Sequence, residues 1–428
     1  MLIKSSRCIK TSGLVAGLSL GSLVVAAPGM ALADDSTMTG NWGGERTRLE
    51  NEGIKITSDY VSETFGTVHG GESHGARYAQ QLRIGARFDL SKILGIDNGG
   101  VVQVMVTDRR GNSASADLVG NRLPVQEIYG GQYTRISEVS YERTIFTPNL
   151  DMKVGFMPMG NDFGGMSILT NFVNAGFCAH PLSMSGGSGW TNAPTGHWGG
   201  MLKYKINDEW AIQTAAFEVN PITNSESKYA LRMSPDHYTG TIMPIEAIYT
   251  RGGTYDGQYK FGWYYDTSDT ARIAGNGTAA GRSGSYVLAD QAVWRSATDP
   301  KRNLHVFGQA TQTDAATSPF RHWYSAGVVL HKPFDSRPDD AIGLAYGRAV
   351  LNERTRDNQI AAATTAAAAD DIDNLDSGEQ LIELSYTAQV TKWLTVRPDV
   401  QYIKEPGAFY GVNTQNALMA GVQVKAAF

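Results

Sequence analysis

The feature that most constrains the fold is a repeated alternation of apolar and polar residues over segments of about ten residues. The C-terminal segment shows this alternation most clearly. One face consists of Leu418, Ala420, Val422, Val424, Ala426 and Phe428, and the other of Met419, Gly421, Gln423, Lys425 and Ala427. A period of two residues places successive side chains on opposite faces of an extended strand. The chain is therefore predicted to be all-β.

Segments of this kind recur along the whole chain and are separated by turn-forming residues. Their predicted starts lie near Lys55, Tyr78, Gly100, Tyr133, Asp151, His197, Glu209, Ile242, Tyr255, Ser285, Lys301, Arg321, Asp339, Gly378, Trp393 and Asn416. These make sixteen strands, an even number that suits a bacterial outer-membrane barrel. A soluble β-sandwich also alternates, but a sandwich of this length would more often divide into domains, and the sequence shows no linker.

The predicted connections alternate between short and long. The short ones include 207–208, 252–253 and 391–392, and the long ones include 110–132, 161–196, 220–241 and 352–377. Short periplasmic turns and long extracellular loops are typical of bacterial outer-membrane barrels, as are aromatic residues near the strand ends. The sequence thus predicts a transmembrane antiparallel β-barrel of sixteen strands in the outer membrane of a Gram-negative cell.

The first 33 residues have the pattern of a secretory signal peptide. Lys4, Arg7 and Lys10 precede an apolar stretch, 13–27, and Ala33 supplies a small residue at the expected cleavage site. A membrane anchor is the alternative, but the apolar stretch is short for a span of about 20 residues and Pro28 follows it. We expect cleavage after Ala33 and a single barrel domain over residues 34–428.

Composition excludes several other classes of protein. The chain has 42 acidic and 37 basic residues, a net charge of −5, which argues against nucleic-acid binding. Two cysteines in 428 residues rule out a disulfide scaffold and a cysteine-based zinc site. Only Cys178 remains after cleavage, and it is expected to be a small buried side chain.

Several blocks of sequence resemble one family of porins. The stretch Thr39–Leu49, TGNWGGERTRL, resembles the N-terminal signature of carbohydrate-selective outer-membrane porins of the OprB type. Further matching blocks follow in order at 88–95, 160–163, 175–178, 286–291, 336–340 and 393–403. The resemblance implies a channel, not an enzyme, that lets monosaccharides, small saccharides or related polyols diffuse into the periplasm. It implies no cofactor.

The long connection 161–196 is the candidate constriction loop, expected to fold into the barrel. Long loops of this kind are usually functional or disordered. Aromatic residues favour an ordered loop here, namely Phe163, Phe172, Phe177 and Trp190. Trp190 is a candidate to stack against a passing sugar ring.

Alternate residues of a strand point to opposite faces of the barrel, and this parity predicts which polar side chains face the lumen. The candidates that line the pathway are Arg83, Arg87, Arg109, Glu138 and Glu142. Arginines opposite carboxylates provide fixed donors and acceptors for hydroxyl groups and a transverse field. Arg109 lies in a block, 107–111, that resembles a family block whose arginine lines the narrowest part of the pore. An ordinary wall residue is the alternative interpretation for each arginine.

One difference from the family's sequence leaves the identity of the transported solute undecided. Ala193 stands before Pro194, where family members carry an aromatic residue, so the pore could be wider or adapted to another solute. The alternatives are a porin for organic acids or other small polar solutes, and a barrel without an open channel. His69, Glu72 and His74 could bind a metal, but an exposed polar loop explains them better.

The last residue, Phe428, indicates that another protein assembly binds the C-terminus during export. A terminal aromatic residue on an alternating strand of an exported protein resembles the signal read by the outer-membrane assembly machinery. The other expected partners are sugars or similar polar solutes, outer-membrane lipid and two further copies of the chain in a homotrimer. Because apolar strand faces suit both lipid and a subunit interface, the sequence does not separate the trimer from a monomer.

Overall fold

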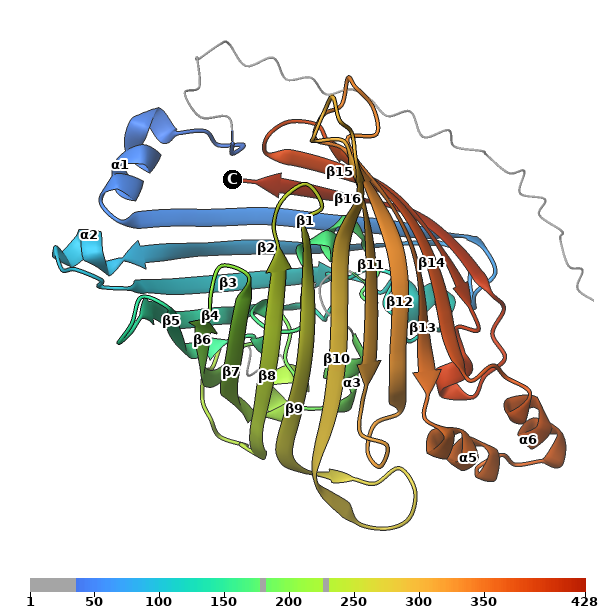
Figure 1. Ribbon diagram of the computed structural model, residues 1–428. Coiled ribbons are helices and arrows are strands. Elements are labelled where there is room, and N and C mark those ends of the chain that lie inside the picture. Colours follow the sequence, from blue (N-terminus) through green and yellow to red (C-terminus); the bar gives the residue numbers. More distant parts are fainter. Residues whose placement is uncertain (1–35, 178–181, 226–230) are drawn as a thin grey trace, which may run out of the picture.

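The computed structural model describes residues 36–177, 182–225 and 231–428, and these form a closed antiparallel barrel (Figure 1). Each strand pairs with its neighbours in sequence, and β1 pairs with β16 to close the barrel. The strands are β1 Ile54–His69, β2 Ala76–Asp89, β3 Val101–Gly111, β4 Tyr133–Thr144, β5 Leu150–Met157, β6 His197–Lys205, β7 Trp210–Val219, β8 Gly240–Arg251, β9 Gly257–Ala271, β10 Thr278–Arg295, β11 Asn303–Gln312, β12 Phe320–His331, β13 Ala341–Leu351, β14 Gly378–Gln389, β15 Leu394–Lys404 and β16 Ala417–Ala427.

The helices are short; η1 and α1 precede β1, and the others lie in the connections between strands. They are η1 Trp42–Gly44, α1 Glu45–Asn51, α2 Leu90–Leu94, η2 Ser115–Val119, η3 Met159–Asn161, η4 Ser167–Asn171, α3 Leu182–Gly187, α4 Pro221–Ser225, α5 Glu353–Ala361, α6 Ala366–Asp373 and η6 Ala408–Tyr410. Within the described ranges, no helix is long and apolar enough to cross a membrane.

The predicted sixteen-stranded barrel is confirmed. One predicted start is wrong by several residues, because β10 begins at Thr278 and not near Ser285. The pairing of β10 with β9 shifts register between Ala280 and Arg282, and Gly281 lies at φ 79°. This irregularity hides the first part of β10 from a search for strict alternation.

The two faces of the barrel reverse the usual arrangement of a soluble protein. Outward-facing Ile84, Phe261 and Leu384 are 53%, 59% and 48% exposed, whereas inward-facing Glu63 and Glu383 are fully buried. Exposed apolar side chains need a hydrocarbon environment, so the outer face fits lipid.

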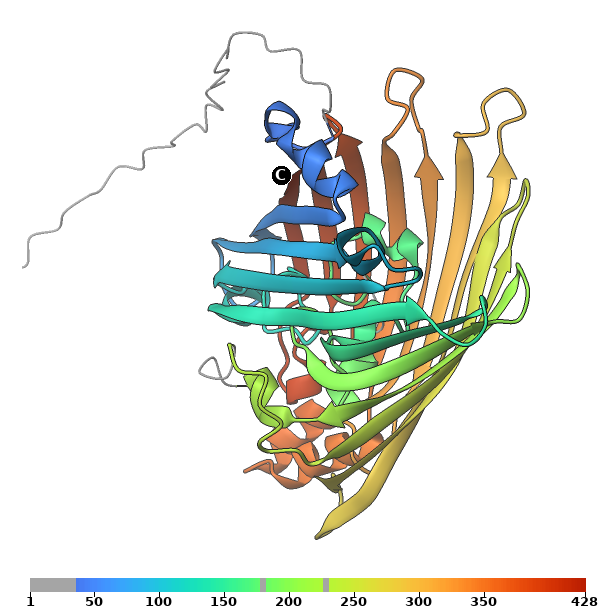
Figure 2. The same ribbon diagram turned by 90° about the vertical axis from the view of Figure 1, so that its left-hand side faces the viewer.

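The two rims of the barrel differ as predicted. The connections 145–149, 206–209, 252–256 and 390–393 are short, and the opposite rim carries 112–132, 158–196, 220–239 and 352–377. Figures 1 and 2 place α1 and the C-terminus together at one end, and the hairpin of α5 and α6 at the other.

The chain ends meet where the barrel closes. Phe428 donates its N–H to the Ser58 carbonyl oxygen at 2.9 Å, and its own carbonyl accepts from Arg46 Nη1 at 3.2 Å. The predicted signal peptide, residues 1–33, lies outside the described residues.

Candidate functional site

Two long connections fold back into the barrel and fill much of its interior. The first, 158–196, contains η3, η4 and α3, of which α3 is visible inside the barrel in Figure 1. The second, 112–132, contains η2. The aromatic residues expected to order the first loop, Phe163, Phe172, Phe177 and Trp190, are each no more than 2% exposed. Cys178 lies outside the described residues.

Buried carboxylates on the barrel wall hold the first loop at three points. Glu246 on β8 accepts the N–H of Gly164 at 2.8 Å, and Asp266 on β9 accepts the N–H of Gly189 at 2.7 Å. Glu383 on β14 accepts two N–H groups, from Val173 at 2.5 Å and from Asn174 at 3.1 Å. All three carboxylates are 0% exposed.

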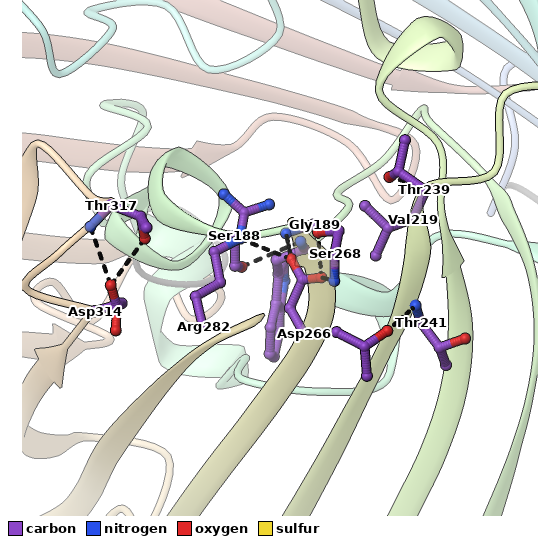
Figure 3. A network of polar contacts seen from close by, with 12 residues as sticks. Ser188, Gly189, Val219, Thr239, Thr241, Asp266, Ser268, Arg282, Asp314 and Thr317 are labelled. Carbon is purple, nitrogen blue, oxygen red and sulfur yellow. Dashed lines mark hydrogen bonds and ion pairs between the residues drawn. The ribbon is translucent and has the colours of Figure 1, made fainter. Parts of the chain in front are cut away.

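The Asp266 anchor belongs to a wider polar network (Figure 3). Its Oδ2 also accepts from Arg282 Nε at 2.8 Å, and its Oδ1 accepts from the Ser268 hydroxyl at 2.5 Å. A charged group buried without such partners costs several kcal/mol. The Arg282 guanidinium and the Ser268 hydroxyl therefore stabilise the Asp266 carboxylate, whose burial without partners would destabilise the folded protein.

The second loop is held in the same way, and the sequence analysis missed its inward course. Glu379 accepts the N–H groups of Arg122 at 2.6 Å and Leu123 at 3.1 Å, and Glu63 accepts that of Ile128 at 3.3 Å. The available signal was the placement of glutamates on lumen-facing positions of β1 and β14.

Arg109 lies where β3 meets the first loop. Its side chain is 7% exposed, Nε donates to Gln81 Oε1 at 2.8 Å, and Nη2 is 3.5 Å from the Ala193 carbonyl oxygen. The carboxylates of Glu63 and Glu127 attract it electrostatically. Parity correctly gave its inward direction, and the structure adds its contact with the first loop.

Arg83 and Arg87 are more open to the lumen. Arg83 Nη2 is 2.7 Å from Asp59 Oδ2, and Arg87 Nη2 is 2.5 Å from Glu142 Oε1. All four side chains keep substantial exposure, between 29% and 43%. Such ion pairs contribute little to stability but leave charged groups accessible to solute.

Glu138 connects this wall to the first loop through Lys153. Its carboxylate accepts from Gln103 Nε2 at 3.0 Å and pairs with Lys153 Nζ at 3.0 Å. Lys153 also pairs with Asp162 of the loop at 3.0 Å. Glu142, Lys153 and Asp162 line a cavity of about 480 Å³ on the periplasmic side of this network. The cavity is large enough for a hexose.

The structure corrects the expectation for Trp190. Its ring is 2% exposed and packs edgewise against Tyr264 and Tyr286, with centroid distances of 5.7 and 5.9 Å. A ring enclosed in this way has no open face for a sugar. The residue orders the loop, and parity could not show this because the ring lies on a loop rather than a strand.

A second cavity, of about 790 Å³, lies beside η4 on the opposite wall. Asp340, in the turn between β12 and β13, belongs to its lining. Burial acts to raise the pKa of the Asp340 carboxyl, but hydrogen bonds from Arg337, Tyr386 and the Gln389 amide outweigh burial and hold this pKa below its usual range. The carboxylate therefore stays charged at neutral pH.

The alternative sites from the sequence find no geometric support. Among the described residues, no group of three His, Cys, Asp or Glu side chains is arranged to hold a metal ion. His69 and His74 both lie exposed at the extracellular rim.

A closed sixteen-stranded barrel with an apolar outer face and inward-folded loops defines an outer-membrane porin. The model of the carbohydrate-selective porin family, OprB, matches residues 73–428. The chain is 33% identical to Porin B of Pseudomonas aeruginosa, over 96% of this chain and 95% of Porin B. The chain belongs to the OprB family of carbohydrate-selective porins, which are channels and not enzymes.

Two further comparisons agree with this assignment. A putative porin of Acinetobacter baylyi, QuiX, is 30% identical over 97% of this chain and 98% of its own length. The solved high-pH structure of Pseudomonas putida OprB superposes with a TM-score of 0.85 at 32% identity, covering 92% of this chain and 98% of that one.

The carboxylate anchors can be tested with two substitutions, each of which should affect a different loop. Glu383→Gln replaces an acceptor oxygen by an NH₂ group that faces a backbone N–H, and leaving a buried donor without an acceptor costs about 1–3 kcal/mol. Hydrogen exchange at Val173 and Asn174 should accelerate by about tenfold or more. Glu379→Gln, the matched control, should accelerate exchange at Arg122 and Leu123 instead. Unchanged exchange at both pairs of amides would show that the carboxylates do not hold the loops.

Proposed function

We propose that the channel passes neutral monosaccharides, small saccharides and related polyols into the periplasm by diffusion. The observation that carries this proposal is the pair of inward loops, each anchored by backbone hydrogen bonds to buried wall carboxylates. These anchors support a fixed narrow passage, which selects by size. The charged side chains left on β2 to β4 supply both donors and acceptors for hydroxyl groups.

The proposed pathway residues have different roles. Arg83, Arg87 and Glu142 present accessible charged groups to the solute. Glu138 is 4% exposed and acts through Lys153, whose position it fixes. Arg109 defines the edge of the passage, because it joins the β3 wall to the Ala193 carbonyl of the constriction loop.

The test is the effect of Arg109→Ala on permeation. Removing the guanidinium should widen the passage, raise single-channel conductance by roughly twofold and reduce discrimination between glucose and a disaccharide. Arg110→Ala is the matched control, because Arg110 is 44% exposed and pairs with Asp108 instead of Gln81.

Planar-bilayer currents and liposome swelling with glucose, a disaccharide and gluconate measure both quantities. Equal permeation of wild type and Arg109→Ala would make Arg109 a wall residue only. Faster entry of gluconate than of glucose in the wild type would favour the alternative porin for organic acids.

The remaining partners are part of the proposal. The signal peptide 1–33 is removed after Ala33, the barrel 34–428 is surrounded by outer-membrane lipid, and the assembly machinery reads Phe428. The homotrimer stays a prediction, which cross-linking and mass measurement in detergent test.

Phe428→Ala separates the signal from the closure of the barrel. The backbone contacts of Phe428 with Ser58 and Arg46 use only its N–H and carbonyl groups, so the substitution leaves them available. We expect outer-membrane levels to fall several-fold while refolding in detergent remains normal. Phe428→Tyr, which keeps an aromatic ring, should restore the levels. Normal levels of Phe428→Ala in cells would contradict the signal role.

A further inference from the structure

The cavity beside η4 is built differently from the rest of the lumen. Its volume of about 790 Å³ lies between Ser167–Asn171 of the constriction loop and the periplasmic ends of strands β10 to β13. On the proposed pathway, a solute that has passed the constriction loop meets this cavity before it reaches the periplasm. None of the sequence motifs or pathway residues discussed above belongs to it, apart from residues of the constriction loop and the 336–340 block.

A buried carboxylate–histidine pair forms its wall. Asp290 on β10 and His305 on β11 are 9% and 8% exposed, and His305 Nδ1 lies 2.9 Å from Asp290 Oδ1. This hydrogen bond fixes the ring and leaves Nε2 as the nitrogen that is free for the cavity. The ring of His331 stands perpendicular to that of His305, with centroids 5.7 Å apart. Both histidines and Asp290 line the cavity.

The constriction loop supplies the facing polar groups. Thr170 donates its hydroxyl hydrogen to the Ser167 carbonyl at 2.8 Å, so its oxygen remains an acceptor. Asn171 donates Nδ2 to the Ile168 carbonyl at 2.9 Å, which leaves its amide oxygen for a ligand. Oxygen acceptors on the loop and the fixed Nε2 of the His305 ring on the wall therefore face the same space.

Most of the charged groups that line the cavity are carboxylates, and three of the four are paired with cations. Asp256, Asp290, Asp339 and Asp340 line it, against the two permanent cations Arg295 and Lys301. Asp256 pairs with Arg295, and Asp339 lies 3.6 Å from Lys301. Asp340 pairs with Arg337. The contact of Asp290 with His305 uses only Oδ1, so Oδ2 is available to accept from hydroxyl groups.

We propose that this cavity is a saccharide-binding subsite on the periplasmic side of the constriction, specific for neutral, hydroxyl-rich solutes. Asp290 accepts hydrogen bonds from hydroxyls of the solute, and His305 Nε2 binds a neighbouring hydroxyl. Thr170 and Asn171 accept from the opposite side of the ring. The inference rests on the proposed sugar pathway, and it adds a site that retains the solute at the exit.

Oriented single channels in planar bilayers test the subsite. Glucose added on the periplasmic side should reduce the ion current at lower concentration than gluconate does. His305→Asn and Asp290→Asn should each raise the half-blocking glucose concentration from that side by about tenfold, because each substitution weakens one hydrogen bond between the solute and the subsite. His69→Asn, the same substitution at the extracellular rim, should leave it unchanged.

The outcomes separate this inference from the proposed function. Heat-modifiable migration in gel electrophoresis first confirms that each variant is a folded barrel. Block by periplasmic glucose that is equal in wild type, His305→Asn and Asp290→Asn would overturn the subsite alone, because liposome swelling with glucose still reports the pathway. Absence of glucose swelling in the wild type would instead overturn the pathway.

Discussion

The structure depends on one kind of interaction, in which a buried carboxylate on the inner wall accepts backbone N–H groups from a loop. A sixteen-stranded barrel encloses a lumen too wide for its own side chains to fill. Loops that enter such a lumen lose conformational entropy and must satisfy their backbone groups there. Glu246, Asp266 and Glu383 do this for the first loop, and Glu379 and Glu63 for the second.

The contrast between the hydrocarbon outside the barrel and the polar lumen explains why the carboxylates lie on the inner wall. The outer face meets lipid, so charge there is expensive, and alternate residues of every strand are free to carry polar groups toward the lumen. Each glutamate or aspartate anchor can thus be placed on a strand without disturbing the lipid-facing residues beside it. The same alternation places Ile382 and Leu384 outward, 44% and 48% exposed, on either side of Glu383.

The sequence predicts the barrel well because each strand carries its own period-two pattern. Parity also gave the inward direction of Arg109 and Glu138. It failed where the pattern is interrupted or absent. The register shift near Gly281 displaced the start of β10, and the burial of Trp190 against Tyr264 and Tyr286 depends on loop packing.

The anchors themselves were not predictable from local sequence. Glu383 is far from Val173 along the chain, and nothing in either segment specifies that pairing. The inward course of 112–132 was missed for the same reason, since its contacts with Glu379 and Glu63 join residues 256 and 65 positions apart in the chain. Long-range hydrogen bonds of this kind depend on how the loops pack inside the closed barrel, which the alternation within the strands does not specify.

We expect the carboxylate anchors to set the size limit of the channel. Liposome swelling with neutral saccharides of increasing size measures that limit directly, in wild type and in the combined variant Glu246→Ala, Asp266→Ala and Glu383→Ala. We expect the wild type to admit monosaccharides and to slow steeply at trisaccharides, and the folded variant to admit trisaccharides readily. The same size limit in both proteins would show that the anchors do not set it.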